Sequence, residues 1–169
     1  MSGVGPKLLS RLLDEHGPAL ELLARQWCRS PADVVQDAFV QLARQSVLPE
    51  NVAGWLYRVV RNGAISQSRS AQRRRQHEAA AGQLQPSWFT PTPADLVDAD
   101  AASEELSRLP IEEREVIVAH LWGRLSFNQI ALLIDTSSST AHRRYQSGLE
   151  KLRETLGVAC LKKKFPTKS

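Results

Sequence analysis

The amino-acid sequence predicts an all-α fold, with two small helical domains joined by a flexible linker that contains prolines. Alternating runs of β-branched and aromatic residues, which are typical of strands, hardly occur. Apolar residues recur instead at spacings of three and four, which is the period of an amphipathic helix. Residues 79–102 interrupt this pattern with prolines, a glycine and a run of alanines. The chain has 169 residues, enough for one ordinary domain or two small ones.

The predicted organisation has four parts, namely a domain at 1–78, the linker at 79–102, a domain at 103–157 and a basic tail at 158–169. Trp88 and Phe89 are unusual in a solvated linker, so we expect them to fold back onto a domain or to contact a partner. The apolar runs are much shorter than the roughly 20 residues of a membrane span, and no secretion signal is indicated. We therefore expect a cytoplasmic protein without membrane insertion.

The first domain is expected to contain helices with apolar stripes. A leucine stripe begins at residue 8, and a second segment follows after Gly17 and Pro18. The run Ser30-Pro31-Ala32-Asp33 indicates a helix start, with a capping serine, a proline in the first turn and an acid three residues on. Pro49 ends that helix, and the next helix begins near Asn51 and continues into a run of arginines.

A helix-turn-helix is predicted in the second domain. A helix at Ile111 to Trp122 begins after Pro110 and is closed by Gly123. The motif Ser126-Phe127-Asn128-Gln129 is a capping box for a short helix that ends near Ile134. Two helices joined by a turn of three or four residues make this motif.

The turn and the last helix complete the motif. Asp135 tolerates the left-handed backbone of the turn, and Ser137 caps a helix that reaches about Leu156. The apolar residues of this helix form one buried stripe. The alternative to DNA binding is an ordinary amphipathic surface helix. The opposite face could enter a major groove, where arginine reads guanine and glutamine reads adenine, and it comprises His142, Arg143, Gln146 and Arg153, with Arg144 and Lys151 on its flank.

Charge is segregated along the chain. Residues 51–77 hold six arginines and no acid, whereas residues 94–115 hold eight acids and two arginines, although the net charge is only +4. Arginines interleaved with an aromatic residue suit single-stranded nucleic acid, because cations hold phosphates and the ring offers a stacking platform. The alternative is that Trp55 and Tyr57 belong to the core and that the arginines only solubilise the surface.

The sequence does not indicate an enzyme. The serines at 137–139, with Asp135 and His142 nearby, could suggest nucleophilic catalysis, but helix capping already explains them. The four histidines and two cysteines lack zinc-ligand spacing, and no glycine-rich phosphate loop is present. We expect no catalytic residue, no metal, no cofactor and no disulfide framework.

The order of these features resembles a bacterial RNA polymerase sigma factor of the extracytoplasmic-function type of the sigma-70 family, which keeps only sigma regions 2 and 4. The resemblance covers roughly residues 8–156 apart from the linker. Within region 2, Asp33-Val34-Val35-Gln36-Asp37-Ala38-Phe39 is similar to the segment that grips the clamp helices of the polymerase β′ subunit. Trp55-Leu56-Tyr57-Arg58-Val59-Val60-Arg61-Asn62 is similar to the part that opens and binds the minus-10 promoter element.

The second domain resembles sigma region 4, which in this family reads the minus-35 element and touches the β flap. The resemblance implies a protein that binds core RNA polymerase, directs it to specific promoters and promotes DNA melting. A stand-alone helix-turn-helix transcriptional regulator is the alternative, whereas a nucleic-acid-processing enzyme would need carboxylate clusters or metal ligands that the sequence lacks. The segments that resemble region 4 are Leu109-Pro110, Arg114-Glu115-Val116, Leu125-Ser126-Phe127 and Gln129-Ile130-Ala131.

Carried over residue by residue, the resemblance implies three binding surfaces. The surface for core polymerase comprises Asp33, Val35, Gln36, Asp37 and Phe39. The surface for single-stranded minus-10 DNA comprises Asn51, Trp55, Arg58, Arg61, Asn62, Ser66 and Arg69, and the loop Leu48 to Asn51 corresponds to a pocket for a flipped base. The surface for the minus-35 duplex comprises Ser137, Thr140, His142, Arg143, Arg144, Gln146 and Ser147.

This sequence departs from the family at a few positions. Gly63 stands where the family tends to be bulkier, Asp135 replaces a frequent turn glycine, and Ser147 stands where a basic residue is common. The approach to the second helix, residues 28–32, is also shorter than usual. These departures concern the promoter sequence more than the role. Many members are held by an anti-sigma factor, although no residue here identifies one, nor the inducing signal.

Overall fold

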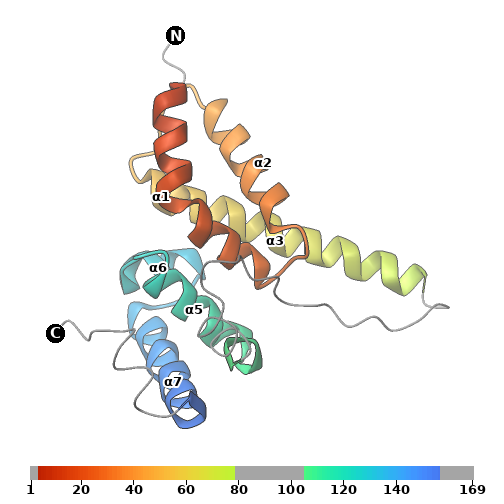
Figure 1. Ribbon diagram of the computed structural model, residues 1–169, viewed down its shortest axis with the longest axis vertical. Coiled ribbons are helices and arrows are strands. Elements are labelled where there is room, and N and C mark those ends of the chain that lie inside the picture. The colour runs from red at the N-terminus through yellow and green to blue at the C-terminus, as the bar shows by residue number, and fades with distance from the viewer. Residues whose placement is uncertain (1–3, 79–104, 157–169) are drawn as a thin grey trace.

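The computed structural model describes residues 4–78 and 105–156, and every regular element among them is a helix (Figure 1). This confirms the all-α fold class. The linker with Trp88 and Phe89 and the basic tail lie outside the described residues, as does the side chain of Leu156. A helical turn at 105–108 precedes the second group of helices. The helices are α1 (Pro6–Arg25), α2 (Pro31–Ala43), α3 (Val52–His77), α5 (Ile111–Leu121), α6 (Phe127–Leu133) and α7 (Ser138–Leu156).

Helix α1 is continuous through Pro18, so the two segments predicted on either side of Gly17 were wrong. A proline removes one helical hydrogen bond. The apolar stripe nevertheless continues across it, since Leu12, Leu20 and Leu23 are all buried in the core. Packing of an amphipathic face stabilises helices in proteins more than local propensity does, which explains the unbroken helix.

Helix α2 begins at Pro31 as predicted, with Ser30 in the N-cap position, but the Ser30 side chain makes no capping hydrogen bond. The helix ends at Ala43, several residues before Pro49. Helices α2 and α3 approach closely at Gly63, where a Cβ atom would stand 3.1 Å from Val34 Cγ1. The absence of a side chain at Gly63 therefore sets the spacing of these two helices.

The helix-turn-helix is confirmed in its details. The Ser126 hydroxyl accepts a hydrogen bond from the Gln129 amide at 3.2 Å, and the Gln129 side-chain oxygen accepts one from the Ser126 amide at 2.8 Å. Asp135 has a left-handed backbone with φ of 53°. The Ser137 hydroxyl accepts from the Thr140 amide at 3.1 Å and caps α7. Each signal is local in the sequence, so its geometry follows from the residue types.

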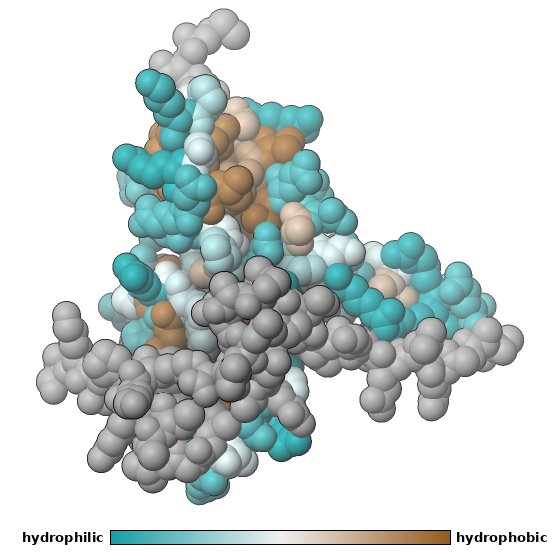
Figure 2. Space-filling model, in the orientation of Figure 1, coloured by the Kyte–Doolittle hydropathy of each residue, from teal (hydrophilic) through white to brown (hydrophobic). Residues whose placement is uncertain are grey.

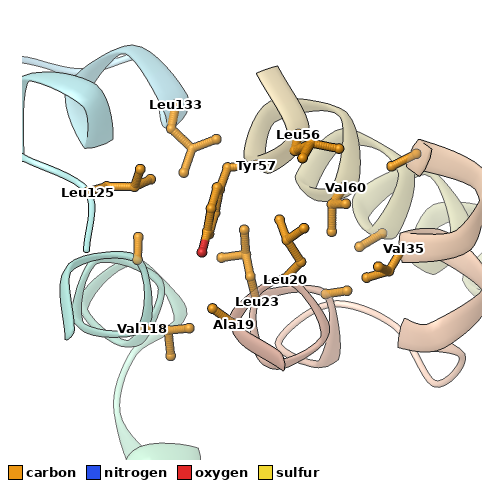
Figure 3. Packing of buried hydrophobic residues seen from close by; sticks show 14 of the residues in the cluster. Ala19, Leu20, Leu23, Val35, Leu56, Tyr57, Val60, Val118, Leu125 and Leu133 are labelled. Carbon is orange, nitrogen blue, oxygen red and sulfur yellow. The ribbon is translucent and has the colours of Figure 1, made fainter. Parts of the chain in front are cut away.

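The three N-terminal helices, α1 to α3, form the N-terminal unit, and α5 to α7 with the preceding turn form the C-terminal unit. Helix α1 contacts α5, and α3 contacts α6, so the two units pack against each other. One hydrophobic cluster runs through both. Figure 3 shows the ring of Tyr57 between Leu20 and Leu23 on one side and Val118 and Leu125 on the other. Tyr57 is therefore core, as the structural alternative for this aromatic residue predicted, and it joins the two units.

Candidate nucleic-acid interface

The exposed face of α3 carries a row of cationic and polar side chains. Arg58, Asn62, Ser66 and Arg69 are all exposed, and they lie three or four residues apart, which places them on one side of the helix. Figure 2 shows hydrophilic residues along the far part of this helix. A hollow of about 700 Å³ follows the row and is lined by Arg61, Asn62, Ile65, Ser66, Arg69, Gln72, Arg73 and Gln76.

Two of the predicted DNA-binding residues at the start of α3, Asn51 and Trp55, also stabilise the helix. Asn51 is exposed, and its side-chain oxygen accepts a hydrogen bond of 2.8 Å from the Gly54 amide, so it caps the helix. Trp55 is half-buried and packs against the core cluster, so only part of its ring is open to solvent. Both residues therefore have structural roles at the start of the helix that carries the arginine row, in addition to their predicted role in DNA binding.

Arg61 differs from the other predicted minus-10 residues because the C-terminal unit already holds it. Its Nε donates a hydrogen bond to Glu115 Oε1, and its Nη2 donates to Glu115 Oε2 at 3.2 Å. The Glu115 side chain is only 3% exposed, and that of Arg61 is 19% exposed. The Arg61 guanidinium carbon also lies 5.7 Å from the ring centroid of Trp27, within range of a cation–π interaction.

The predicted minus-35 residues divide between an exposed row and a half-buried set. Ser137, His142, Arg143 and Gln146 are exposed on the start and outer face of α7. Thr140, Arg144 and Ser147 are half-buried.

Two of these half-buried residues have partners within the protein. The Thr140 hydroxyl accepts a hydrogen bond of 2.9 Å from the Ser137 hydroxyl in the cap of α7. The Ser147 hydroxyl donates to Glu113 on α5 at 2.8 Å, so it faces the inside of the C-terminal unit. The same Glu113 carboxylate forms an ion pair with Lys151 at 2.7 Å.

An aromatic cluster, which the sequence did not predict, fixes α7 against the two preceding helices. The ring of His120 stacks on Phe127 at 4.4 Å and meets Tyr145 edge-on at 4.8 Å. His120 Nδ1 lies 2.8 Å from the carbonyl oxygen of Leu125, and because a carbonyl only accepts, Nδ1 carries a proton. Burial raises the pKa of Tyr145, although nearby Arg153 partly opposes this shift. The cluster orients the face of α7 that carries the exposed row.

The residues predicted to bind polymerase on α2 also divide into an exposed group and a buried group. Asp33, Gln36 and Asp37 are exposed, whereas Val35 is buried at 2% exposure and Phe39 packs against the core. Val35 and Phe39 can therefore support this surface from beneath. Val40, which the sequence analysis missed, is exposed and lies three residues beyond Asp37 on the same side of the helix. Its position at helical spacing from the two acids was the available signal.

Two findings concern what the described parts of the chain lack. Within residues 4–78 and 105–156, no three His, Cys, Asp or Glu side chains come together as a group that could hold a metal ion. None of the helices described above has both the length and the apolar character needed to cross a bilayer.

Comparison with protein families places both units in one family. The model of sigma-70 region 2 matches residues 12–74, and the model of sigma-70 region 4 matches residues 99–152. Together the two models span more than half of the chain. No curated protein sequence matches the chain significantly.

Two solved structures resemble most of the chain. The sigma factor RpoE of Bartonella quintana, crystallised with the anti-sigma factor NepR, superposes with a TM-score of 0.74 at 23% identity, covering 92% of this chain and 99% of that one. CnrH in complex with the cytosolic domain of CnrY superposes with a TM-score of 0.61 at 22% identity, covering 92% of each chain. Both share the fold.

Sigma factors of this family bind core RNA polymerase and promoter DNA, and they serve in transcription initiation without catalysing a reaction. The match to regions 2 and 4, with the helix order and the helix-turn-helix described above, agrees with the resemblance seen in the sequence. The chain belongs to the sigma-70 family of RNA polymerase sigma factors, with region 2 in the N-terminal unit and region 4 in the C-terminal unit.

Proposed function

We propose that this sigma factor binds core RNA polymerase through α2, captures the unpaired minus-10 strand on α3 and places α7 in the minus-35 duplex. The observation that supports this proposal most strongly is the exposed row on α3, where arginine and polar side chains follow one face beside a half-buried tryptophan. Such a face can track a phosphate backbone and stack a base at the same time.

Strand capture would begin at the N-terminal end of α3. Arg58 and Arg69 can each pair with phosphates, while Asn62 and Ser66 between them offer hydrogen bonds to bases or sugars. Trp55 exposes part of its ring for stacking at the point where the loop 48–51 joins the helix. Binding of this kind releases counterions, so we expect its affinity to fall steeply as salt concentration rises.

Duplex recognition would use the exposed row of α7. The amino end of a helix attracts phosphate through its free amides and dipole, and Ser137 supplies a hydroxyl at that end. Arg143 and Gln146 point outward one turn further along, where a recognition helix contacts base edges. The aromatic cluster around His120 holds this helix in place, so the two side chains would enter the groove together.

Polymerase binding would use the outer face of α2. Asp33 and Asp37 present two carboxylates, Gln36 lies between them, and Val40 adds an exposed apolar side chain. A mixed acidic and apolar face of this kind fits a partner surface with basic and apolar residues. On this proposal, replacing Asp37 by lysine weakens binding to core polymerase in a pull-down, and unchanged binding would contradict the assignment.

The proposed function is tested by transcription from a genomic promoter library with core polymerase, with and without the protein. Expected is transcription from a subset of promoters only when the protein is present. In the same assay, the double change Arg58→Ala and Arg69→Ala should abolish strand opening, read by permanganate reactivity of unpaired thymines, while duplex binding by α7 persists. The matched control is Arg11→Ala, an exposed arginine on α1 that does not line the hollow along α3.

Two results would refute this reading. Normal promoter opening by the Arg58 and Arg69 double variant would remove α3 from the mechanism. Sequence-specific DNA binding without polymerase, combined with no effect on transcription by core enzyme, would favour the stand-alone regulator. Because the two solved relatives are complexes with NepR and with the cytosolic domain of CnrY, we also propose a regulatory protein of this class as a partner.

A further inference from the structure

We propose that Arg124, in the loop between α5 and α6, is a further binding residue for the minus-35 duplex and pairs with a phosphate at the edge of the major groove. The inference deepens the proposed function of the C-terminal unit and rests on it, because it assumes that α7 enters that groove. Arg124 is not among the residues predicted from the sequence. Its backbone, its lack of partners and its position beside α7 carry the inference.

The first observation is the backbone of Arg124. Among the described residues other than glycine, only Arg124 and Asp135 have a positive φ, at 54° and 53°. Aspartate tolerates this left-handed conformation, because its side chain is short and polar and can form local hydrogen bonds. A long arginine side chain has no such advantage, so the residue type does not explain Arg124. Strained residues of this kind cluster at functional sites, which indicates a use for the Arg124 side chain.

Backbone hydrogen bonds on both sides fix Arg124 in this conformation. The Gly123 amide donates to the Val118 carbonyl at 3.1 Å, and the Leu125 amide donates to the Ala119 carbonyl at 3.1 Å. A Cβ atom at position 123 would stand 2.5 Å from the Ala119 carbonyl oxygen, so the neighbouring glycine is needed for space. The loop therefore presents Arg124 from a defined backbone position.

The guanidinium of Arg124 is available to a ligand. The residue is exposed, and in the part of the chain that the structure describes no hydrogen bond or ion pair involves its side chain. Other arginines do have such partners, since Arg61 pairs with Glu115, and Arg108 pairs with Glu105 at 2.6 Å. A glycine would adopt the backbone of residue 124 without steric cost. An arginine at this position is thus better suited to a partner molecule than to the fold.

The loop that carries Arg124 lies next to the exposed row of α7. His120 Nδ1 is 2.8 Å from the Leu125 carbonyl oxygen, which holds the loop against α5. The Phe127 ring meets the ring of His142, a member of the exposed row, edge-on at 4.9 Å. Arg124 precedes Phe127 by three residues, which span at most about 11 Å. The backbone of Arg124 therefore lies within about that distance of the backbone of Phe127, at the contact with α7.

This position suits a phosphate group. In a helix-turn-helix the second helix lies in the major groove, and the first helix crosses the DNA backbone. The groove is about 12 Å wide, and a helix with its side chains is about 10–12 Å across. The recognition helix therefore fills the groove, and phosphates flank it. Because the loop leads into α6, the first helix, its arginine would meet phosphate oxygens, which a guanidinium binds through two hydrogen bonds.

The test measures how tightly the full-length protein binds a fluorescein-labelled duplex of about 25 base pairs, by fluorescence anisotropy at several potassium chloride concentrations. One duplex carries the minus-35 region of a promoter found in the library assay, and a second carries the same bases in scrambled order. Arg124→Gly removes the charge and accepts the left-handed backbone, whereas Arg124→Lys keeps the charge. The matched control is Arg11→Ala, an exposed arginine on α1. Urea denaturation is recorded for every protein.

A phosphate contact predicts a loss of affinity that does not depend on base sequence. Arg124→Gly should weaken binding to both duplexes by the same factor, about three- to tenfold, and lower the salt slope by about one. Arg124→Lys should keep the wild-type salt slope, and Arg11→Ala should change neither affinity nor slope. Arg124→Gly should also unfold at a higher urea concentration than wild type, because glycine relieves the strained backbone.

Three results would overturn the assignment. Wild-type affinity and salt slope in Arg124→Gly would mean that no phosphate reaches the side chain. A lower urea midpoint in Arg124→Gly would mean that the arginine stabilises the loop itself. Weaker binding to core polymerase with unchanged duplex affinity would assign the loop to a protein partner instead.

Failure of this inference and failure of the proposed function are distinguishable. If only Arg124 is assigned wrongly, the wild-type protein prefers the promoter duplex to the scrambled one and directs transcription, and Arg124→Gly binds both duplexes as wild type does. If the proposed function is wrong, the wild-type protein does not distinguish the two duplexes, and promoter-dependent transcription is missing for every variant.

Discussion

The ring of Tyr57 in the N-terminal unit lies directly against Gly123 in the C-terminal unit. A Cβ atom at position 123 would stand 2.9 Å from both the Cε1 atom and the hydroxyl oxygen of Tyr57. Only a glycine leaves room for this ring at the end of α5. Tyr57 is fully buried there, and its hydroxyl lacks a hydrogen-bond partner among the residues that the structure describes. The ring of Tyr57 is therefore well packed, but its hydroxyl is buried at an unfavourable free-energy cost.

Tyr57→Phe should stabilise the protein. Losing a hydroxyl that is buried without a partner removes a desolvation cost of about 1–3 kcal/mol, so we expect the free energy of unfolding to rise by about 1 kcal/mol. The measurement is urea denaturation at neutral pH. The other tyrosine, Tyr145, is only half-buried, so Tyr145→Phe is a matched control with a smaller expected gain. A lower stability of Tyr57→Phe would contradict the packing described above.

Tyr57 should also make stability depend on alkaline pH. Burial raises the pKa of its phenol well above the ordinary value of 10.0. The unfolded chain therefore loses this proton first, so the contribution of Tyr57 is complete below about pH 10 and is lost as the pH rises further, by up to about 1.4 kcal/mol per pH unit. Urea denaturation of wild type and Tyr57→Phe between about pH 9 and 11 measures the difference. Equal slopes in both proteins would mean that the phenol ionises freely in the fold.

Asn51 should show two separable roles. Asn51→Ala removes the acceptor that caps α3 and should cost about 1 kcal/mol of stability. Asn51→Asp keeps an acceptor at the amino end of the helix, so thermal unfolding should stay close to wild type. Its added negative charge should nevertheless weaken promoter opening, because it lies beside the proposed strand. Undiminished opening by Asn51→Asp would leave Asn51 with the capping role alone.

The neighbours Gln146 and Ser147 should behave oppositely in duplex binding. Gln146 is exposed on the outer face of α7, whereas the Ser147 hydroxyl is bound to Glu113. We expect Gln146→Ala to relax sequence preference in the minus-35 element at a cost of about 1–3 kcal/mol, and Ser147→Ala to leave that preference intact. Electrophoretic mobility shifts with systematically altered duplexes measure both. A loss of specificity in Ser147→Ala would return Ser147 to the DNA-binding surface.

The parts of the fold that the sequence predicted correctly are those determined by neighbouring residues. The capping box of Ser126 and Gln129, the left-handed Asp135 and the Ser137 cap involve partners three residues apart or a single backbone angle. Pro18 shows the limit of such signals. Its local effect is to break a helix, but buried leucines on both sides keep α1 intact.

The contact between the two units was not predicted, because it joins residues far apart in the sequence. Arg61 and Glu115 are 54 positions apart, and they belong to different charge blocks, the basic block at 51–77 and the acidic block at 94–115. One signal was available. Glu115 precedes the continuous apolar run Val116 to Ala119, and a helix that is apolar on several sides is buried on several sides. A carboxylate that is buried with such a helix requires a cationic partner. The run of arginines on α3 was the candidate source of that partner.

Gly63 brings α2, which carries the proposed polymerase surface, close to α3, which carries the proposed strand-binding surface. Val34 Cγ1 of α2 lies 3.1 Å from the position that a Cβ atom would take at residue 63 of α3, so a larger residue there would force the two helices apart. Closely packed interiors transmit strain, so a displacement of α2 would be passed to α3 through this contact. On the proposed function, docking of the polymerase on α2 would therefore also shift the face of α3 that holds the separated strand.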